Sequence, residues 1–232
     1  MGIANGVHHL AICTKDIKKQ IEFFTQVVGA ELVALYWMHG VDKTFHGFLR
    51  LNDSSSIAFV QHPDIAKIQP QRGVSHAGWT AENVAPGVMQ HLALNVDSYA
   101  DLMAIRDRVR SYGHWIMGPL DHGFCKSIYL AGPEGIMLEF STSEGNAIDA
   151  EAWIDPEVVA LAGISTDELA RYKRPPCFES KDGKVPQPKP DPSKPLIDHP
   201  NPAIWTMSDE EVSRRMSETT PPVDVKAKNK AA

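Results

Sequence analysis

Three side chains that are far apart in the sequence could together bind a divalent metal ion: His9, His91 and Glu139. Each histidine opens a similar apolar segment, HLAI in the first case and HLAL in the second. Glu139 interrupts the apolar run IMLEF, and a carboxylate buried there without a partner costs several kcal/mol. Two imidazoles and one carboxylate leave positions open on non-haem iron(II), and zinc hydrolases use the same ligand types. The residues therefore predict a metal site but do not identify the metal.

The elements around these side chains form a duplicated pattern. Each histidine begins a predicted strand, which leads through an acidic residue into an amphipathic helix that ends at Gly29 in one copy and Gly113 in the other. Three strand-like segments follow each helix, at 31–38, 44–51 and 55–61 and then at 114–118, 127–132 and 136–142. Each half is thus predicted to be β-α-β-β-β, and the glycine-containing connection at 70–87 could close over a site.

Strand alternation predicts which side chains share a face of each sheet. Successive side chains on a strand point to opposite sides, so His9 lies with Ala11 and Cys13, and Glu139 lies with Met137 and Ser141. His91 shares its face with Ala93 and Asn95 in the same way, and His8 is expected to point to the opposite, structural side. We therefore expect the two histidines and the glutamate to converge in one shared bowl.

Segments VHHLAICTKDI, MQHLALNV and GPEGIMLEF resemble those of the vicinal oxygen chelate superfamily, which includes glyoxalase I, fosfomycin-resistance enzymes, methylmalonyl-CoA epimerase and type I extradiol dioxygenases. The resemblance covers residues 7–142. It implies an α+β fold in which two βαβββ modules form a cupped mixed sheet around one divalent metal ion. It also implies that His9, His91 and Glu139 are the metal ligands.

The stretch HGFCKSIYLAGPEGIMLE, residues 122–139, is similar to the extradiol dioxygenase signature. This resemblance implies that His122 and Tyr129 hydrogen-bond to the substrate or to metal-bound oxygen. Leu120 and Gly132 depart from the usual pattern. Those dioxygenases carry a histidine that acts as a base just before the last strand of the first module, whereas serines occupy residues 54–56 here. His46 or His76 could replace this base only if its side chain pointed into the bowl.

A fourth ligand, found in glyoxalase I-like members, is also missing from the first module. Alignment of SSIAFVQ with IMLEFST places Phe59 at its position, and phenylalanine cannot bind a metal. The resemblance therefore favours a dioxygenase-like enzyme with Fe(II), whose substrate is a small aromatic or enolic molecule that binds through vicinal oxygens. The alternatives are a non-redox isomerase, epimerase, lyase or thiol transferase that uses Zn, Mn or Ni, and a ligand-sequestering resistance protein.

Composition and charge limit the partners and the location. The 232 residues carry a net charge of −6, so the protein has no overall positive field for nucleic acid or an anionic membrane. Cys13, Cys125 and Cys177 form no CxxC pair, and the N-terminal segment lacks a signal sequence, which favours the cytoplasm. We expect a metal-binding domain at 1–146, with modules at about 7–62 and 87–142, followed by an extension at 147–232 with short helices and a proline-rich tail. In the extension, Asp155 and Pro156 are expected to begin one helix, and Ser165 with Glu168 to form a capping box for a second. A homodimer is a candidate assembly.

Overall fold

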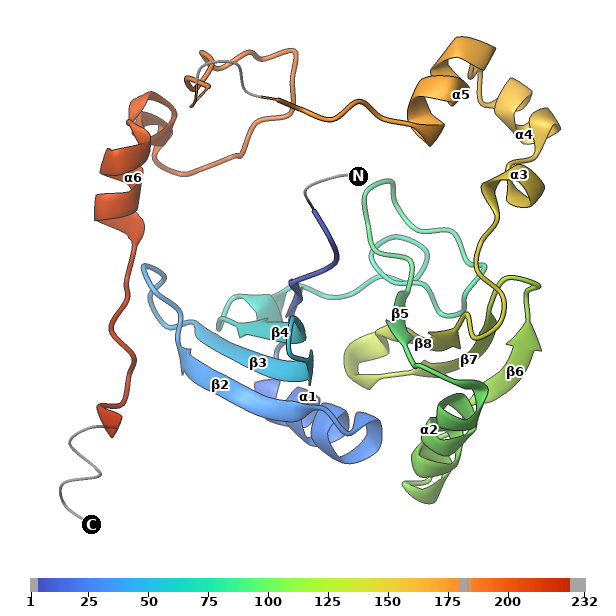
Figure 1. The fold of residues 1–232 in the computed structure, drawn as a ribbon. Coiled ribbons are helices and arrows are strands. Elements are labelled where there is room, and N and C mark those ends of the chain that lie inside the picture. Colours follow the sequence, from blue (N-terminus) through green and yellow to red (C-terminus); the bar gives the residue numbers. More distant parts are fainter. Residues whose placement is uncertain (1–3, 180–182, 184, 226–232) are drawn as a thin grey trace. The chain divides into compact units, whose positions relative to one another are not determined.

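A computed structural model describes residues 4–179, 183 and 185–225 of the chain. The chain divides into two compact units, one ending at Lys173 and the other beginning at Arg174, and each is described by itself. The first unit contains two four-stranded sheets, one from each predicted module (Figure 1). The expected α+β fold with two βαβββ modules is therefore present.

The first module follows the predicted order of elements. It consists of β1 (His9–Cys13), α1 (Ile17–Phe23) with its π-helical continuation η1 (Phe24–Val28), β2 (Glu31–Trp37), β3 (Phe45–Asn52) and β4 (Ser55–Gln61). The Asp16 carboxylate caps α1 by accepting the Lys19 N–H, and Gly29 ends η1 with a φ of 92° that favours glycine. The sheet order is β1-β4-β3-β2, with β1 parallel to β4.

The second module repeats this topology. It consists of β5 (Leu92–Asn95), α2 (Tyr99–Ser111), β6 (Met117–Asp121), β7 (Lys126–Ala131) and β8 (Met137–Thr142), in the sheet order β5-β8-β7-β6. The expected strand at 114–118 is wrong by about three residues. Met117 pairs with Tyr129, whereas the Trp115 side chain lies exposed before the strand. Pairing with β7 therefore decided where β6 begins.

One hydrophobic core joins the two modules on the helix-facing sides of their sheets. Its fully buried side chains come from both modules: Phe24, Phe59, Leu102, Val109, Ile128 and Leu138. Arg108 on α2 donates hydrogen bonds to the carbonyl oxygens of Gln26 and Val27 at the end of η1, where a cation is favoured by the helix dipole. The core leaves the opposite face of each sheet for function.

The helices after β8 largely follow their predicted capping signals. They are α3 (Ala150–Trp153), α4 (Pro156–Leu161) and α5 (Thr166–Lys173), and Ser165 and Glu168 form the expected capping box. In the second unit, Ser208 caps α6 (Asp209–Met216) after the short η4 (Pro202–Thr206). The short helices η2 (Ile65–Lys67) and η3 (Pro133–Gly135) complete the described elements. In the described part of the chain, every helix is too short or too polar to cross a bilayer.

Candidate functional site

Four polar side chains form a hydrogen-bonded row on the open face of the second module. His91 Nε2 lies 2.9 Å from Glu139 Oε2, and the Tyr129 hydroxyl donates to Glu139 Oε1 at 3.2 Å. His122 Nε2 lies 2.8 Å from the Tyr129 hydroxyl oxygen at the other end of the row. Four of the five predicted site residues are therefore in one continuous network.

Strand register explains how these residues meet. Glu139 on β8 pairs with Ala93 on β5 and with Tyr129 on β7, so the carboxylate and the phenol point to the same side of the sheet. His91 immediately precedes β5, two residues before Ala93, and therefore lies on the same face. His122 follows β6 in the tight turn that leads into β7. The alternation expected from the sequence accounts for the row.

The hydrogen bonds determine which atoms carry protons in this row. Tyr129 has one hydroxyl hydrogen, which it donates to Glu139, so its oxygen can only accept from His122. His122 must therefore carry its proton on Nε2. Burial raises the pKa of Tyr129, and the nearby Glu139 charge raises it further, although a hydrogen bond with Ser127 lowers it. Tyr129 remains a neutral phenol and can act as a hydrogen-bond donor.

The surroundings of His91 fit a metal ligand. Its Nδ1 faces the Gln90 side-chain oxygen, and the Gln90 amide is oriented by donating to the carbonyl oxygens of Trp79 and Glu82. The other ring nitrogen, Nε2, faces the Glu139 carboxylate. Both ring nitrogens of His91 face acceptor oxygens, and a neutral imidazole has only one N–H to donate. The contact between Nε2 and the Glu139 carboxylate is therefore favourable only when a proton or a metal cation lies between the two atoms. Glu139 is only 7% exposed, and a cation there would also compensate its buried charge.

Gln90 is a candidate for orienting His91 that the sequence did not reveal. We expect Gln90→Leu to weaken metal binding about 10–100-fold, because the His91 ring loses the acceptor that fixes its tautomer and orientation. Isothermal titration of the purified variant with Zn²⁺ or Mn²⁺ measures this effect. Gln71→Leu changes an exposed glutamine with no described side-chain hydrogen bond and serves as a control for nonspecific loss of affinity. Unchanged affinity in Gln90→Leu would contradict the role.

The open face of the first module carries rings rather than acids. His9 packs edge-on against Phe48 at 5.4 Å between ring centroids, and His46 lies 4.5 Å from Phe48. Tyr36 contacts His46 through its hydroxyl at 3.3 Å. Burial lowers the pKa of His46, and the nearby His9 lowers it further. Tyr36 and Phe48 were missed, although strand alternation in TFHGFLRL places Phe48 on the face of His46.

Within one chain His9 does not join the His91–Glu139 pair. Among residues 4–179, 183 and 185–225, no group of three His, Cys, Asp or Glu side chains is arranged to hold a metal ion. The Nδ1 atom of His9 instead lies 2.9 Å from Nδ1 of His8. The expectation that His8 points away is wrong, because β1 begins at His9 and strand alternation does not extend to His8. The three-residue ligand set therefore stays a prediction.

The first module's counterpart of Glu139 is Ala58, and the expected equivalence with Phe59 is wrong. Ala11, two residues after His9, pairs with Ala58, just as Ala93, two residues after His91, pairs with Glu139. Phe59 instead points into the core and contacts Phe24. The consequence drawn from Phe59 still holds, because alanine cannot bind a metal either.

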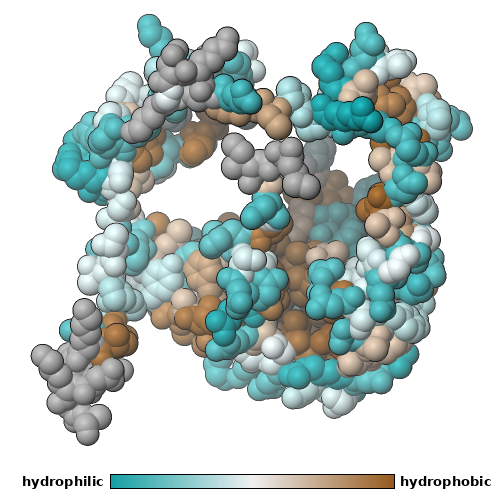
Figure 2. All heavy atoms as spheres, viewed as in Figure 1, coloured by the Kyte–Doolittle hydropathy of each residue, from teal (hydrophilic) through white to brown (hydrophobic). Residues whose placement is uncertain are grey.

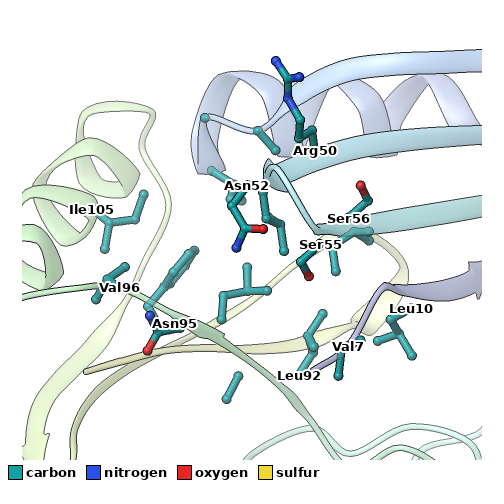
Figure 3. Close-up of a pocket in the computed structure, with 18 of the residues that line it drawn as sticks. Val7, Leu10, Arg50, Asn52, Ser55, Ser56, Leu92, Asn95, Val96 and Ile105 are labelled. Carbon is teal, nitrogen blue, oxygen red and sulfur yellow. The ribbon is translucent and has the colours of Figure 1, made fainter. Parts of the chain in front are cut away.

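Two pockets adjoin the modules. The larger, of about 590 Å³, is lined by Leu10, Asn52 and Ser55 of the first module and by Leu92 and Ile105 of the second (Figure 3). Apolar side chains are visible between the two modules in the space-filling view (Figure 2). The five predicted site residues do not line this pocket, so it marks the junction between modules rather than the polar row.

The smaller pocket, of about 300 Å³, lies closer to the site. Its lining includes Ala11 and Cys13, which share the face of His9, and Met137, which shares the face of Glu139. Gln90 and His76 from the connecting loop complete one side. His76 Nδ1 bonds to the Ser75 hydroxyl at 2.9 Å, so this candidate base is held in the loop.

Comparisons with known proteins found one family model and several solved structures that resemble this chain. A search of curated proteins found no match. Among solved structures, the trypanothione-dependent glyoxalase I of Leishmania major is 15% identical, with a TM-score of 0.44 over 69% of this chain and 99% of that chain. The fosfomycin resistance protein FosX of Listeria monocytogenes is 16% identical, with a TM-score of 0.42 over 60% of this chain and 94% of that one.

A glyoxylase/bleomycin resistance protein/dioxygenase domain from a Frankia species is 16% identical, with a TM-score of 0.47 over 60% of this chain and 98% of that chain. The family model described as Glyoxalase/Bleomycin resistance protein/Dioxygenase superfamily matches residues 6–140, which include both modules. This match spans more than half of the 232 residues, and both modules have the βαβββ topology. The chain therefore belongs to the glyoxalase/bleomycin resistance protein/dioxygenase superfamily.

Proposed function

We propose that this protein is a metal-dependent dioxygenase-like enzyme that binds a small aromatic or enolic substrate through two vicinal oxygens. His9, His91 and Glu139 would hold the metal, with Fe(II) as the proposed ion. The observation that carries the proposal is the position of Tyr129, whose hydroxyl bonds to both Glu139 and His122. A row that runs from an exposed imidazole through a buried phenol to a buried carboxylate suits an enzyme better than a passive binding site.

The bound metal would supply Lewis acidity and a common template for the substrate and dioxygen. Glu139 and His91 hold one side of that site, and Gln90 keeps the His91 ring oriented. Tyr129, a neutral phenol, is suited to donate its hydroxyl proton to a substrate oxygen beside Glu139. His122, which is exposed, can then take up a proton from water at Nδ1 while it passes its Nε2 proton to the Tyr129 oxygen.

The aromatic side chains of the first module are an argument for a planar substrate. Tyr36 and Phe48 are parallel within 6°, with ring centroids 6.5 Å apart, and Phe48 also contacts the His9 ring. Ala11 and Ala58 leave the neighbouring strand positions small. An aromatic ring could stack there while its oxygens face the metal. Phe59 and Trp37 do not contribute to this group of rings, because Phe59 is in the core and Trp37 packs on Phe45.

A second copy of the chain would complete the site. One chain brings together only His91 and Glu139, and a twofold dimer would present His9 of each copy to the pair of the other. The homodimer is thus part of the proposed function.

Oxygen consumption tests the proposed reaction directly. Protein loaded anaerobically with Fe(II) is expected to consume about one O₂ for each substrate molecule converted from a panel of catechols, and Glu139→Ala is expected to consume none. Turnover with Zn or Mn without oxygen demand would contradict the redox assignment and support an isomerase or lyase. Tight ligand binding without turnover, unaffected by Glu139→Ala, would instead indicate a sequestering protein.

A further inference from the structure

The indole ring of Trp153 packs against the turn that carries His122. Trp153 ends α3, the first helix after the two modules, and its ring lies edge-on to Phe124 with 4.8 Å between ring centroids. A Cβ atom placed on Gly123 would come within 2.9 Å of the indole atom Cζ2. Gly123 also has a φ of 85°, so both its backbone conformation and this close contact require glycine. The first appended helix therefore contacts the β6–β7 turn closely.

His122 depends on this turn for its orientation. The Asp121 carboxylate accepts the Gly123 N–H at 2.9 Å, and the His122 N–H donates to the Cys125 carbonyl at 2.8 Å. These bonds shape the turn locally but do not connect it to any element outside the β6–β7 hairpin. The His122 side chain itself is exposed, and its one described ring hydrogen bond is to Tyr129. A small rotation of the turn would therefore move the imidazole out of hydrogen-bonding distance.

The indole packing is the principal described contact that holds this turn from outside the sheet. Lys173 on α5 forms an ion pair with Glu151 on α3, which links the appended helices to one another. The Glu151 side chain is 80% exposed, and exposed pairs contribute little to stability. The edge-on contact between Trp153 and Phe124, by contrast, has a preferred geometry and covers a large ring surface, so it restrains the position of the turn. The restraint on the turn thus comes mainly from Trp153.

We infer that Trp153 is a positioning residue, which holds the Gly123–Phe124 turn so that His122 Nε2 stays bonded to Tyr129. The segment after the two modules thereby contributes to the site although it supplies no group to the polar row. The inference concerns the His122–Tyr129 hydrogen bond in the protein itself. It therefore stands whether the reaction is an oxygenation or a non-redox conversion.

Histidine ring signals in ¹⁵N-edited NMR test the inference on metal-free protein, at a fixed pH of about 8 where an ordinary imidazole is neutral. The wild-type His122 ring is expected to show one tautomer with its proton on Nε2. In Trp153→Ala, its two nitrogen shifts are expected to move toward the values of a rapidly exchanging tautomer mixture. Trp153→Phe keeps a ring against the turn and is expected to restore most of the wild-type pattern.

Two further variants keep the test decisive. Phe124→Leu removes the other half of the ring pair and is expected to change the His122 signals in the same direction. Trp115→Ala removes an indole that is 77% exposed and is expected to leave them unchanged. Wild-type His122 signals in folded Trp153→Ala and Phe124→Leu would overturn the inference. Where turnover is measurable, Trp153→Ala is expected to lower kcat about tenfold without changing metal content.

Discussion

Replacing Glu139 or His91 with alanine is expected to abolish retention of a divalent metal ion. Glu139 is the carboxylate of the row and His91 presents Nε2 to it at 2.9 Å, so each variant removes a ligand that its neighbour cannot replace. Elemental analysis of protein purified without chelator measures the result, with about one metal per chain expected for the wild type and less than about one tenth for either variant. His9→Ala is expected to lose the metal as well.

Tyr129→Phe is the matched control for this loss. It removes the hydroxyl that bonds to Glu139 but keeps the ring and every proposed ligand, so it is expected to retain most of the metal. Circular dichroism should report a folded protein in all variants, because the core lies on the other face of the sheets. If folded Glu139→Ala kept one metal per chain, Glu139 would not be a ligand and the proposed site would be wrong.

Mixing two inactive variants is expected to restore metal sites if His9 comes from a second copy. In the proposed dimer, each site takes His9 from one chain and the His91–Glu139 pair from the other. A mixed dimer of His9→Ala and Glu139→Ala therefore has one site with both substitutions and one site with all three ligands. When equal amounts are unfolded together and refolded, about half of the dimers are mixed, so about a quarter of all sites should regain metal and activity. Each variant refolded alone should regain none.

The outcome of the mixing experiment separates two arrangements of the same ligands. In a site completed within one chain, each variant keeps its own defect, and the mixture would bind no more metal than its components. That result would contradict the shared site but would leave the three ligands intact. Sedimentation velocity on the mixture gives the control, because the shared site requires that the recovered metal travels with the dimer.

Local signals in the sequence accounted for most of the fold. Asp16 and Ser98 cap α1 and α2 as their positions predict, and Ser165 with Glu168 forms the expected capping box. These features depend on neighbouring residues only, which is why they could be recognised without a structure. The strand β6 was misplaced because its beginning depends on pairing with β7, and pairing is set by contacts between distant residues.

The chemical face of the second module was also determined by the sequence. Alternation along β8 put Glu139 on the face opposite Leu138, and the spacing from His122 to Tyr129 carried the resemblance to the dioxygenase signature. The first inference needed only the two-residue period of a strand, and the second needed the resemblance to a known family. They led to a row of four side chains that the structure joins by hydrogen bonds.

Tertiary structure alone decided the surroundings of that row. The register of β1 against β4 made Ala58 the counterpart of Glu139, and folding of the connecting loop turned the Gln90 oxygen toward His91. Trp153 reaches the His122 turn only because α3 packs on it. None of these relations follows from a local period or capping rule. The register and the Trp153 contact depend on how segments far apart in the chain approach one another, and the Gln90 amide is oriented by the carbonyl oxygens of Trp79 and Glu82.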